Sequence, residues 1–228
     1  MTISRRHIIC TSLMTLATPT LAQESASIHP QSTRPVWLTV FLYSGFETID
    51  ALGPVEMLGY VKNYSVRFVS LEGGTVRSAQ DVPIATEKYS EKDSVDIVLI
   101  PGAAPDFLKL PQAFFAMIKK ACEKAQKVLT VCTGSFLLAQ TGLLDARKAT
   151  SNKNALPMVM KAVPKVLWQK KARWVADGKF YTSSGITAGM DMALGFVSDT
   201  YGPAEAKRIA AFTEYRWSEE PGNDPFAK

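Results

Sequence analysis

The 228-residue chain is poor in cysteine and histidine, with three cysteines (Cys10, Cys122 and Cys132) and two histidines. So few thiols exclude a framework of disulfide bonds. Zinc sites need clustered thiolate or imidazole ligands, and these residues are too few and too scattered to supply them. We therefore predict no metal ion and no other cofactor.

The chain also lacks a strong charge imbalance, a repeat, a low-complexity tract and a long apolar run. Its formal charge is +5, and loss of Arg5 and Arg6 would lower it to +3. That charge is too small to indicate binding to nucleic acid. No apolar run reaches the roughly 20 residues that span a bilayer. Because nucleic acid and a membrane span are disfavoured, we expect the partner to be a small-molecule substrate.

The N-terminus has the layout of a secretory signal over residues 1–22: two arginines, an apolar stretch, and small residues before Gln23. The segment around Arg5-Arg6 also resembles a twin-arginine export signal, and a general secretory signal or a membrane anchor are the alternatives. Residues 23–35 are polar and turn-rich, which predicts a flexible lead-in. Residues 36–228 then form a single domain of a periplasmic or secreted protein, without a membrane span once the signal is removed.

Strands and helices alternate along this domain. Short runs of β-branched and large apolar residues predict buried parallel strands at 36–42, 65–71, 95–100 and 128–131. Apolar periodicity predicts helices at 48–60, 111–125, 133–140, 154–163, 188–201 and 203–215. Asp177-Gly178 predicts the turn of a hairpin between 172–176 and 179–182. This alternation indicates a doubly wound α/β sandwich with a mostly parallel central sheet.

Cys132 lies where a predicted strand turns sharply into a helix, through Cys132-Thr133-Gly134. This arrangement is that of a nucleophile elbow with sulfur in place of the serine oxygen. A thiol at a helix N-terminus faces unpaired N–H groups, which lower its pKa. A buried, inert cysteine at a strand end is the alternative. We interpret Cys122, on a plain helical stretch, as an ordinary packed residue.

Two further segments end at the same edge of the predicted sheet. Pro101-Gly102-Ala103 follows a buried strand, and its backbone N–H groups, with that of Thr133, are candidates for an oxyanion hole. Asp50 lies after the first strand, at the edge where open α/β sheets bind ligands. A first-turn acid or N-cap that stabilises the helix at 48–60 is the alternative role for Asp50.

Together these segments resemble the ThiJ/PfpI superfamily, which is class I glutamine amidotransferase-like. The resemblance spans residues 36 to about 215. Within the superfamily, the chain looks most like the branch that contains the isocyanide hydratases and the sensor domains of certain AraC-type regulators. This resemblance implies a flavodoxin-like fold and a homodimer. It implies that Cys132 is the nucleophile, that Thr133 follows it, and that Asp50 is the acid/base. Its motifs begin at Asp50-Ala51-Leu52-Gly53-Pro54, Pro101-Gly102, Val131-Cys132-Thr133-Gly134, Gly142-Leu143-Leu144-Asp145 and Gly185-Ile186-Thr187-Ala188-Gly189.

The sequence departs from many family members at Asn152, which occupies the position of a histidine. His29, the one histidine after the predicted signal, lies in the lead-in, so no Cys-His dyad can form within the domain. Amidotransferase and papain-like protease mechanisms, which need an imidazole, are therefore disfavoured. A Cys-carboxylate pair remains, because a desolvated Asp50 would have a raised pKa.

Three functions fit these residues. The first is hydration of an isocyanide to an N-substituted formamide by Cys132 and Asp50. The second is a glyoxalase-like reaction on reactive carbonyls. The third is a non-catalytic protein that senses a ligand or the redox state through Cys132. Only 13 residues follow Tyr215, so we do not expect the DNA-binding module of the regulators.

Overall fold

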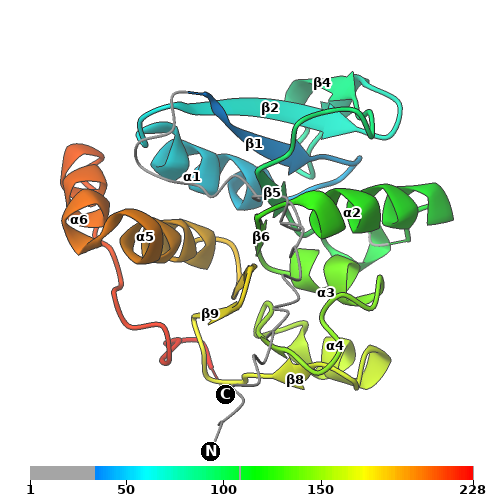
Figure 1. Ribbon diagram of the computed structural model, residues 1–228. Coiled ribbons are helices and arrows are strands. Elements are labelled where there is room, and N and C mark those ends of the chain that lie inside the picture. Colours follow the sequence, from blue (N-terminus) through cyan, green and yellow to red (C-terminus); the bar gives the residue numbers. More distant parts are fainter. Residues whose placement is uncertain (1–33, 108, 228) are drawn as a thin grey trace, which may run out of the picture.

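Residues 34–107 and 109–227 are described by a computed structural model, and within them eight strands form one sheet (Figure 1). Six inner strands are parallel, and only the outermost strand at each edge is antiparallel to its neighbour. The α/β class and the mostly parallel sheet are thus confirmed. In spatial order the strands are β3 (Gly74–Arg77), β4 (Pro83–Lys88), β2 (Tyr64–Ser70), β1 (Val36–Phe41), β5 (Ile97–Ile100), β6 (Lys127–Thr130), β10 (Phe180–Ser183) and β9 (Trp174–Asp177).

Helices cover both faces of this sheet, which is why its central strands are almost entirely apolar. Helices α1, α5 and α6 pack together on one side, while α2 and α3 lie on the other (Figure 1). Phe41, Leu99 and Leu129 on the central strands are fully buried between these layers. The helices are α1 (Thr48–Gly59), α2 (Gln112–Lys124), α3 (Gly134–Ala139), α4 (Leu156–Ala162), α5 (Ala188–Tyr201) and α6 (Pro203–Phe212), with a 3-10 turn η1 (Pro105–Phe107).

The predicted elements are confirmed with small shifts of their bounds, and the main omission lies at one edge of the sheet. The β3–β4 hairpin was not predicted, because its residues are largely exposed and its strands contain charged side chains and Pro83. Such residues are typical of edge strands, where they discourage pairing with other chains. A two-stranded sheet of β7 (Lys148–Ala149) and β8 (Leu167–Trp168) was also missed.

The order of the strands creates a crevice between β1 and β5, since the chain leaves β1 for β2 on one side and reaches β5 on the other. Ligands of open α/β sheets bind outside the carboxyl ends of the strands at such a point. Two contacts join the loops that follow these strands: an isolated bridge between Phe46 and Ala103, and a 2.8 Å hydrogen bond from the Glu47 N–H to the Gly102 carbonyl. The loop after β1 and the loop after β5 are therefore held together at the carboxyl edge of the sheet.

The predicted signal peptide and most of the lead-in lie outside the described residues. At the end of the lead-in, Arg34 donates to both oxygens of Asp96, over 2.9 and 2.7 Å. In the part of the chain that the structure describes, no helix is long and apolar enough to cross a membrane.

The C-terminal segment folds back across the domain and is anchored by buried ion pairs. Asp191 on α5 accepts from Arg173 and, through its other oxygen, from the Tyr215 hydroxyl at 3.1 Å and the Ser218 N–H at 2.8 Å. Asp224, also buried, lies 3.9 Å from the Arg173 guanidinium. These contacts make the tail part of the domain.

Candidate active site around Cys132

Cys132 has the backbone geometry of a nucleophile elbow. Its φ is +57°, in the left-handed region that non-glycine residues rarely adopt. Its N–H donates to the Ser184 carbonyl at 3.0 Å, and its carbonyl accepts from the Ser135 and Ser151 hydroxyls. A Cβ on Gly134 would lie 2.3 Å from the Ile100 carbonyl oxygen, so this turn packs tightly against the end of β5. These contacts fix the sulfur at the carboxyl edge of the sheet.

Burial, charge and hydrogen bonds shift the pKa of the Cys132 thiol in opposite directions. Burial, and then the charge of Asp50, raise its pKa to about 12, although hydrogen bonds from the Thr133 N–H, the Asn152 side chain and the Ile186 N–H favour the thiolate. The lowered pKa expected from the sequence is therefore wrong for the free protein. Donors at the short helix α3 do not offset the loss of water and the nearby carboxylate.

Asp50 is fully buried, and its carboxyl group faces the elbow rather than capping α1. Its Oδ2 accepts from the Gly102 N–H at 3.0 Å, and its Oδ1 has no hydrogen-bond partner among the described residues. Burial raises the pKa of Asp50 to about 8; the Gly102 N–H lowers it, the Glu47 charge raises it, and the Cys132 side chain lowers it. A carboxyl group with this pKa can both donate and accept a proton near neutral pH.

The predicted oxyanion donors already have partners. The Gly102 N–H donates to Asp50, and the Ala103 N–H donates to the Thr133 hydroxyl at 2.9 Å. That hydroxyl in turn donates to the Ala103 carbonyl at 2.7 Å. Gly102 and Ala103 therefore hold Asp50 and Thr133 in place, and their role toward an oxyanion stays a prediction. The Thr133 N–H is directed at the sulfur.

Asn152 lies against Cys132 although it comes from a distant loop. Its Oδ1 accepts from the Asn154 N–H at 2.9 Å and the Ala155 N–H at 3.2 Å, ahead of α4. Its amide group is thereby left to donate to the sulfur. An amide cannot take up a proton at physiological pH, which leaves the Asp50 carboxyl as the candidate acceptor for the thiol proton among the described residues of this site.

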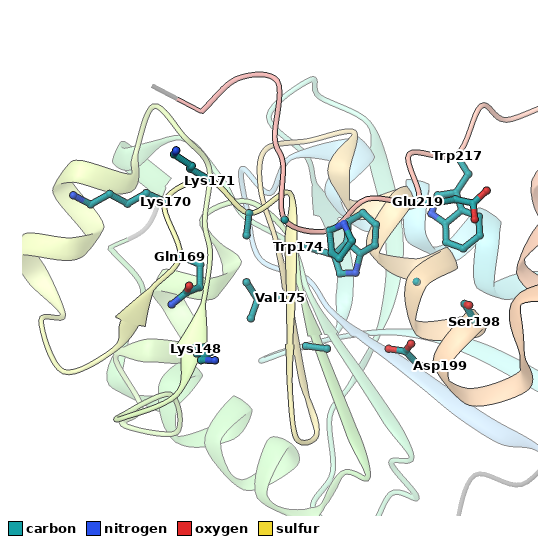
Figure 2. A pocket seen from close by; sticks show the side chains of 15 residues that line it. Lys148, Gln169, Lys170, Lys171, Trp174, Val175, Ser198, Asp199, Trp217 and Glu219 are labelled. Carbon is teal, nitrogen blue, oxygen red and sulfur yellow. The ribbon is translucent and has the colours of Figure 1, made fainter.

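A cavity of about 290 Å³ opens onto the sulfur. A larger one, of about 720 Å³, runs along the edge strand β9 and is lined by Trp174 and Trp217 together with lysines and acids (Figure 2). That larger cavity contains neither cysteine nor Asp50. We place the candidate chemistry in the smaller cavity, because it is lined by Cys132, whose backbone is strained.

The structure also locates the second cysteine of the domain and the types of side chain that bind metal ions. Cys122 is fully buried on α2 and free, as predicted for a packed residue, and burial raises its pKa. Among the described residues, no three His, Cys, Asp or Glu side chains gather so that they could hold a metal ion.

The geometry of this site can be compared with known proteins. The sequence pattern of the DJ-1/PfpI family matches residues 37–199. The chain belongs to the DJ-1/PfpI family. Isonitrile hydratase from Pseudomonas putida is 28% identical over 179 residues, which cover 76% of this chain and 76% of that protein.

Other DJ-1/PfpI relatives have different descriptions. The HTH-type transcriptional regulator GbdR from Pseudomonas aeruginosa is 26% identical over 182 residues, covering 77% of this chain and 49% of the regulator. The crystal structure of a ThiJ/PfpI family protein from Pseudomonas syringae superposes with a TM-score of 0.71, at 23% identity, over 92% of this chain and 84% of that one. At that identity the structural likeness shows the fold alone.

Sequence reasoning missed several contributors to this DJ-1/PfpI site. Ile186 was not among the candidate site residues, yet its N–H reaches the sulfur and the residue lines the cavity. The buried Tyr43 hydroxyl donates to the Pro101 carbonyl at 2.9 Å and steadies the loop before Gly102. Asn152 was identified only as a missing histidine. No local sequence pattern identifies these residues, because each is far from Cys132 in the sequence and comes close to it only in the folded chain.

Proposed function

We propose that this chain is a cysteine-dependent enzyme that hydrates a small isocyanide to an N-substituted formamide. Cys132 is the nucleophile and Asp50 carries the protons. The observation that carries the proposal is the buried Asp50 carboxyl, whose Oδ2 is held by the Gly102 N–H and which interacts with the Cys132 side chain. The similarity to isonitrile hydratase over most of both chains supports the same reaction.

In the first step the Cys132 sulfur bonds to the isocyanide carbon. The thiol proton passes to Asp50, and a proton from the Asp50 carboxyl reaches that carbon, which yields a thioimidate, Cys132–S–CH=N–R. The carboxyl holds one proton before and after this exchange. A pKa of about 8 allows Asp50 to release and regain the proton at little cost near neutral pH.

In the second step water adds to the thioimidate carbon. Asp50 passes a proton from water to the nitrogen, so the intermediate is Cys132–S–CH(OH)–NH–R. The carbon–sulfur bond then breaks, the hydroxyl proton returns to sulfur through Asp50, and the formamide leaves. Atoms balance as R–NC plus H₂O giving R–NH–CHO, with no change of oxidation state that needs a redox partner.

The test is turnover of simple isocyanides by purified protein, followed by NMR detection of the formamide. Cys132→Ser and Asp50→Asn should abolish turnover or reduce it by at least about 10²-fold, the range associated with loss of acid–base catalysis. Cys122→Ser, which removes the other thiol of the domain, should leave it unchanged. Formation of formamide at equal rates in Cys132→Ser and wild type would refute the proposal, as would no turnover of any isocyanide.

A ligand- or redox-sensing protein is the second candidate, favoured by the match of most of this chain to about half of a regulator. Mild peroxide would then convert Cys132 to a sulfenic or sulfinic acid. Intact-mass spectrometry distinguishes this function, since an unmodified Cys132 in a protein that turns over isocyanides excludes it.

The proposal also includes the location of the enzyme and its oligomeric state. We propose export through the N-terminal segment and a homodimer as the working form. Recovery of a chain beginning at Gln23 from the periplasm or medium would support export, and light scattering of that chain would test the dimer.

A further inference from the structure

Glu47 is the one charged side chain among the described residues that line the cavity at Cys132. The other walls are mostly small and apolar, from the loop after β5 and from Ala155 and Ile186, with the Asn152 and Asn154 amides beside them. None of these described lining residues carries a positive charge that could balance a carboxylate on a ligand. The cavity thus combines a small volume, apolar walls and one negative charge.

The side chain of Glu47 is held in position rather than left free in solvent. Its Oε1 accepts from the Gln80 Nε2 at 2.7 Å, and Gln80 is itself fixed because its Oε1 accepts from the Thr48 hydroxyl and the Thr48 N–H. Gln80 lies in the turn of the β3–β4 hairpin. The backbone of Glu47 is tied to the Gly102 carbonyl. A fixed carboxylate acts on a ligand more strongly than a mobile one, because it cannot swing away toward water.

The charge of Glu47 reaches the reacting groups, since it contributes to the raised pKa of Asp50. An anionic ligand group in the cavity would meet the same field. Partial exclusion of water makes such repulsion stronger than it is in bulk solvent. An uncharged group avoids the repulsion, and a cationic group is attracted.

We infer that Glu47, positioned by Gln80, is a specificity-determining residue that admits small uncharged or cationic ligands to Cys132 and rejects carboxylates. Combined with the proposed function, on which this part rests, the substrate class is a small isocyanide with an apolar or positively charged substituent. The volume of about 290 Å³ lies just below the usual range for small-molecule pockets, which favours a small substituent.

The first test does not depend on turnover. In a Cys122→Ser background, Cys132 is alkylated with iodoacetamide, which is neutral, and with iodoacetate, which is anionic, and the ratio of the two rates is divided by the ratio for free cysteine. This double ratio cancels changes in the thiolate fraction. In wild type it should favour iodoacetamide by about tenfold at low ionic strength, and Glu47→Gln should bring it to within about twofold of free cysteine.

Glu56→Gln is the matched control, because it removes the same charge from an exposed position on α1, the helix that Glu47 precedes. It should leave the double ratio unchanged. Glu47→Gln keeps an oxygen that can accept from Gln80, so its fold is expected to persist. Equal double ratios in wild type and Glu47→Gln would overturn the inference, as would an effect of Glu56→Gln as large as that of Glu47→Gln.

The second test uses turnover of isocyanoacetate and of its methyl ester. The ester should be preferred by wild type, and Glu47→Gln should narrow the preference by about tenfold. If neither compound is a substrate while the alkylation ratio changes as expected, the proposed reaction is wrong and the charge selection stands. If both are turned over with the same preference in wild type and Glu47→Gln, the reaction stands and the inference fails.

Discussion

The side-chain amide of Asn152 faces the sulfur of Cys132 because its oxygen is held in the other direction by the N–H groups of Asn154 and Ala155. Asn152 thus donates a hydrogen bond that favours the thiolate form of Cys132, and its amide group cannot take up the thiol proton. The position that many family members fill with a histidine is here a fixed, neutral donor. Asp50 is therefore the described residue beside Cys132 whose pKa suits proton transfer near neutral pH.

Asn152→Asp tests this arrangement, because aspartate can keep both backbone hydrogen bonds while it loses the donor to sulfur. A lost hydrogen bond to a charged group and an added negative charge should raise the pKa of Cys132 by about one unit or more. The rate of alkylation at pH 8 should fall about tenfold. Asn154→Asp, which adds the same charge nearby without removing the donor, should have a smaller effect; equal effects would contradict the role of Asn152.

The raised pKa of Asp50 predicts that stability depends on pH. The folded protein favours the protonated acid, so the stabilising difference is present below the unfolded pKa of about 3.8 and is lost as pH rises toward about 8. Wild type should lose stability across this window, while Asp50→Asn, which cannot ionise, should have a flatter profile. Urea unfolding of both proteins at several pH values between 4.5 and 9 measures the difference. Parallel profiles would mean that Asp50 is ionised in the fold.

The two buried charges that anchor the C-terminal tail should contribute far more to stability than exposed ones. Asp191 and Arg173 have side chains that are 1% and 9% exposed, so Asp191→Asn leaves a buried guanidinium without its full partner and should cost about 3–5 kcal/mol. Glu72→Gln breaks an exposed pair with Lys88 and should cost less than about 1 kcal/mol. Thermal unfolding compares the two, and limited proteolysis should cut Asp191→Asn near Trp217 first.

The parts of the fold that could be predicted from the sequence are those that local patterns determine. The buried strands around Leu99 and Leu129 need continuous apolar runs, and the turn at Cys132 needs a strand, a small residue such as Gly134 and a helix in immediate succession. The β3–β4 hairpin could not be recognised, because an exposed edge strand has no apolar pattern to separate it from a loop.

The properties of the site itself depend on distances that only the fold supplies. Burial of Asp50 was foreseen as a condition for its raised pKa, and the structure meets that condition. The opposite direction of the thiol pKa was not foreseen, because a helix N-terminus is visible in the sequence while burial and the nearness of Asp50 are not. Ile186, 54 positions beyond Cys132, could not be placed beside the sulfur by any local signal.

Gly102 is one of the glycines at which the site has no room for a side chain. A Cβ there would lie 2.6 Å from both the nitrogen and the hydroxyl oxygen of Thr133, and 3.0 Å from the Oδ2 of Asp50. Because the Thr133 nitrogen belongs to the backbone of the elbow, relief requires the loop after β5 to move away from Cys132. Gly102→Ala should therefore cost about 1–3 kcal/mol of stability.

The same substitution should impair the site beyond its effect on stability. Movement of the loop stretches the hydrogen bond from the Gly102 N–H to Asp50, so the pKa of Asp50 should rise further, and the loss of stability with rising pH that Asp50 causes should extend to higher pH. Gly59→Ala is the control, since a Cβ at the end of α1 meets nothing within 4 Å and should be neutral or stabilise by up to about 1 kcal/mol. If Gly102→Ala unfolds at the same urea concentration as Gly59→Ala and keeps the wild-type pH profile, the close packing of Gly102 against Thr133 is not what holds Asp50 beside the thiol.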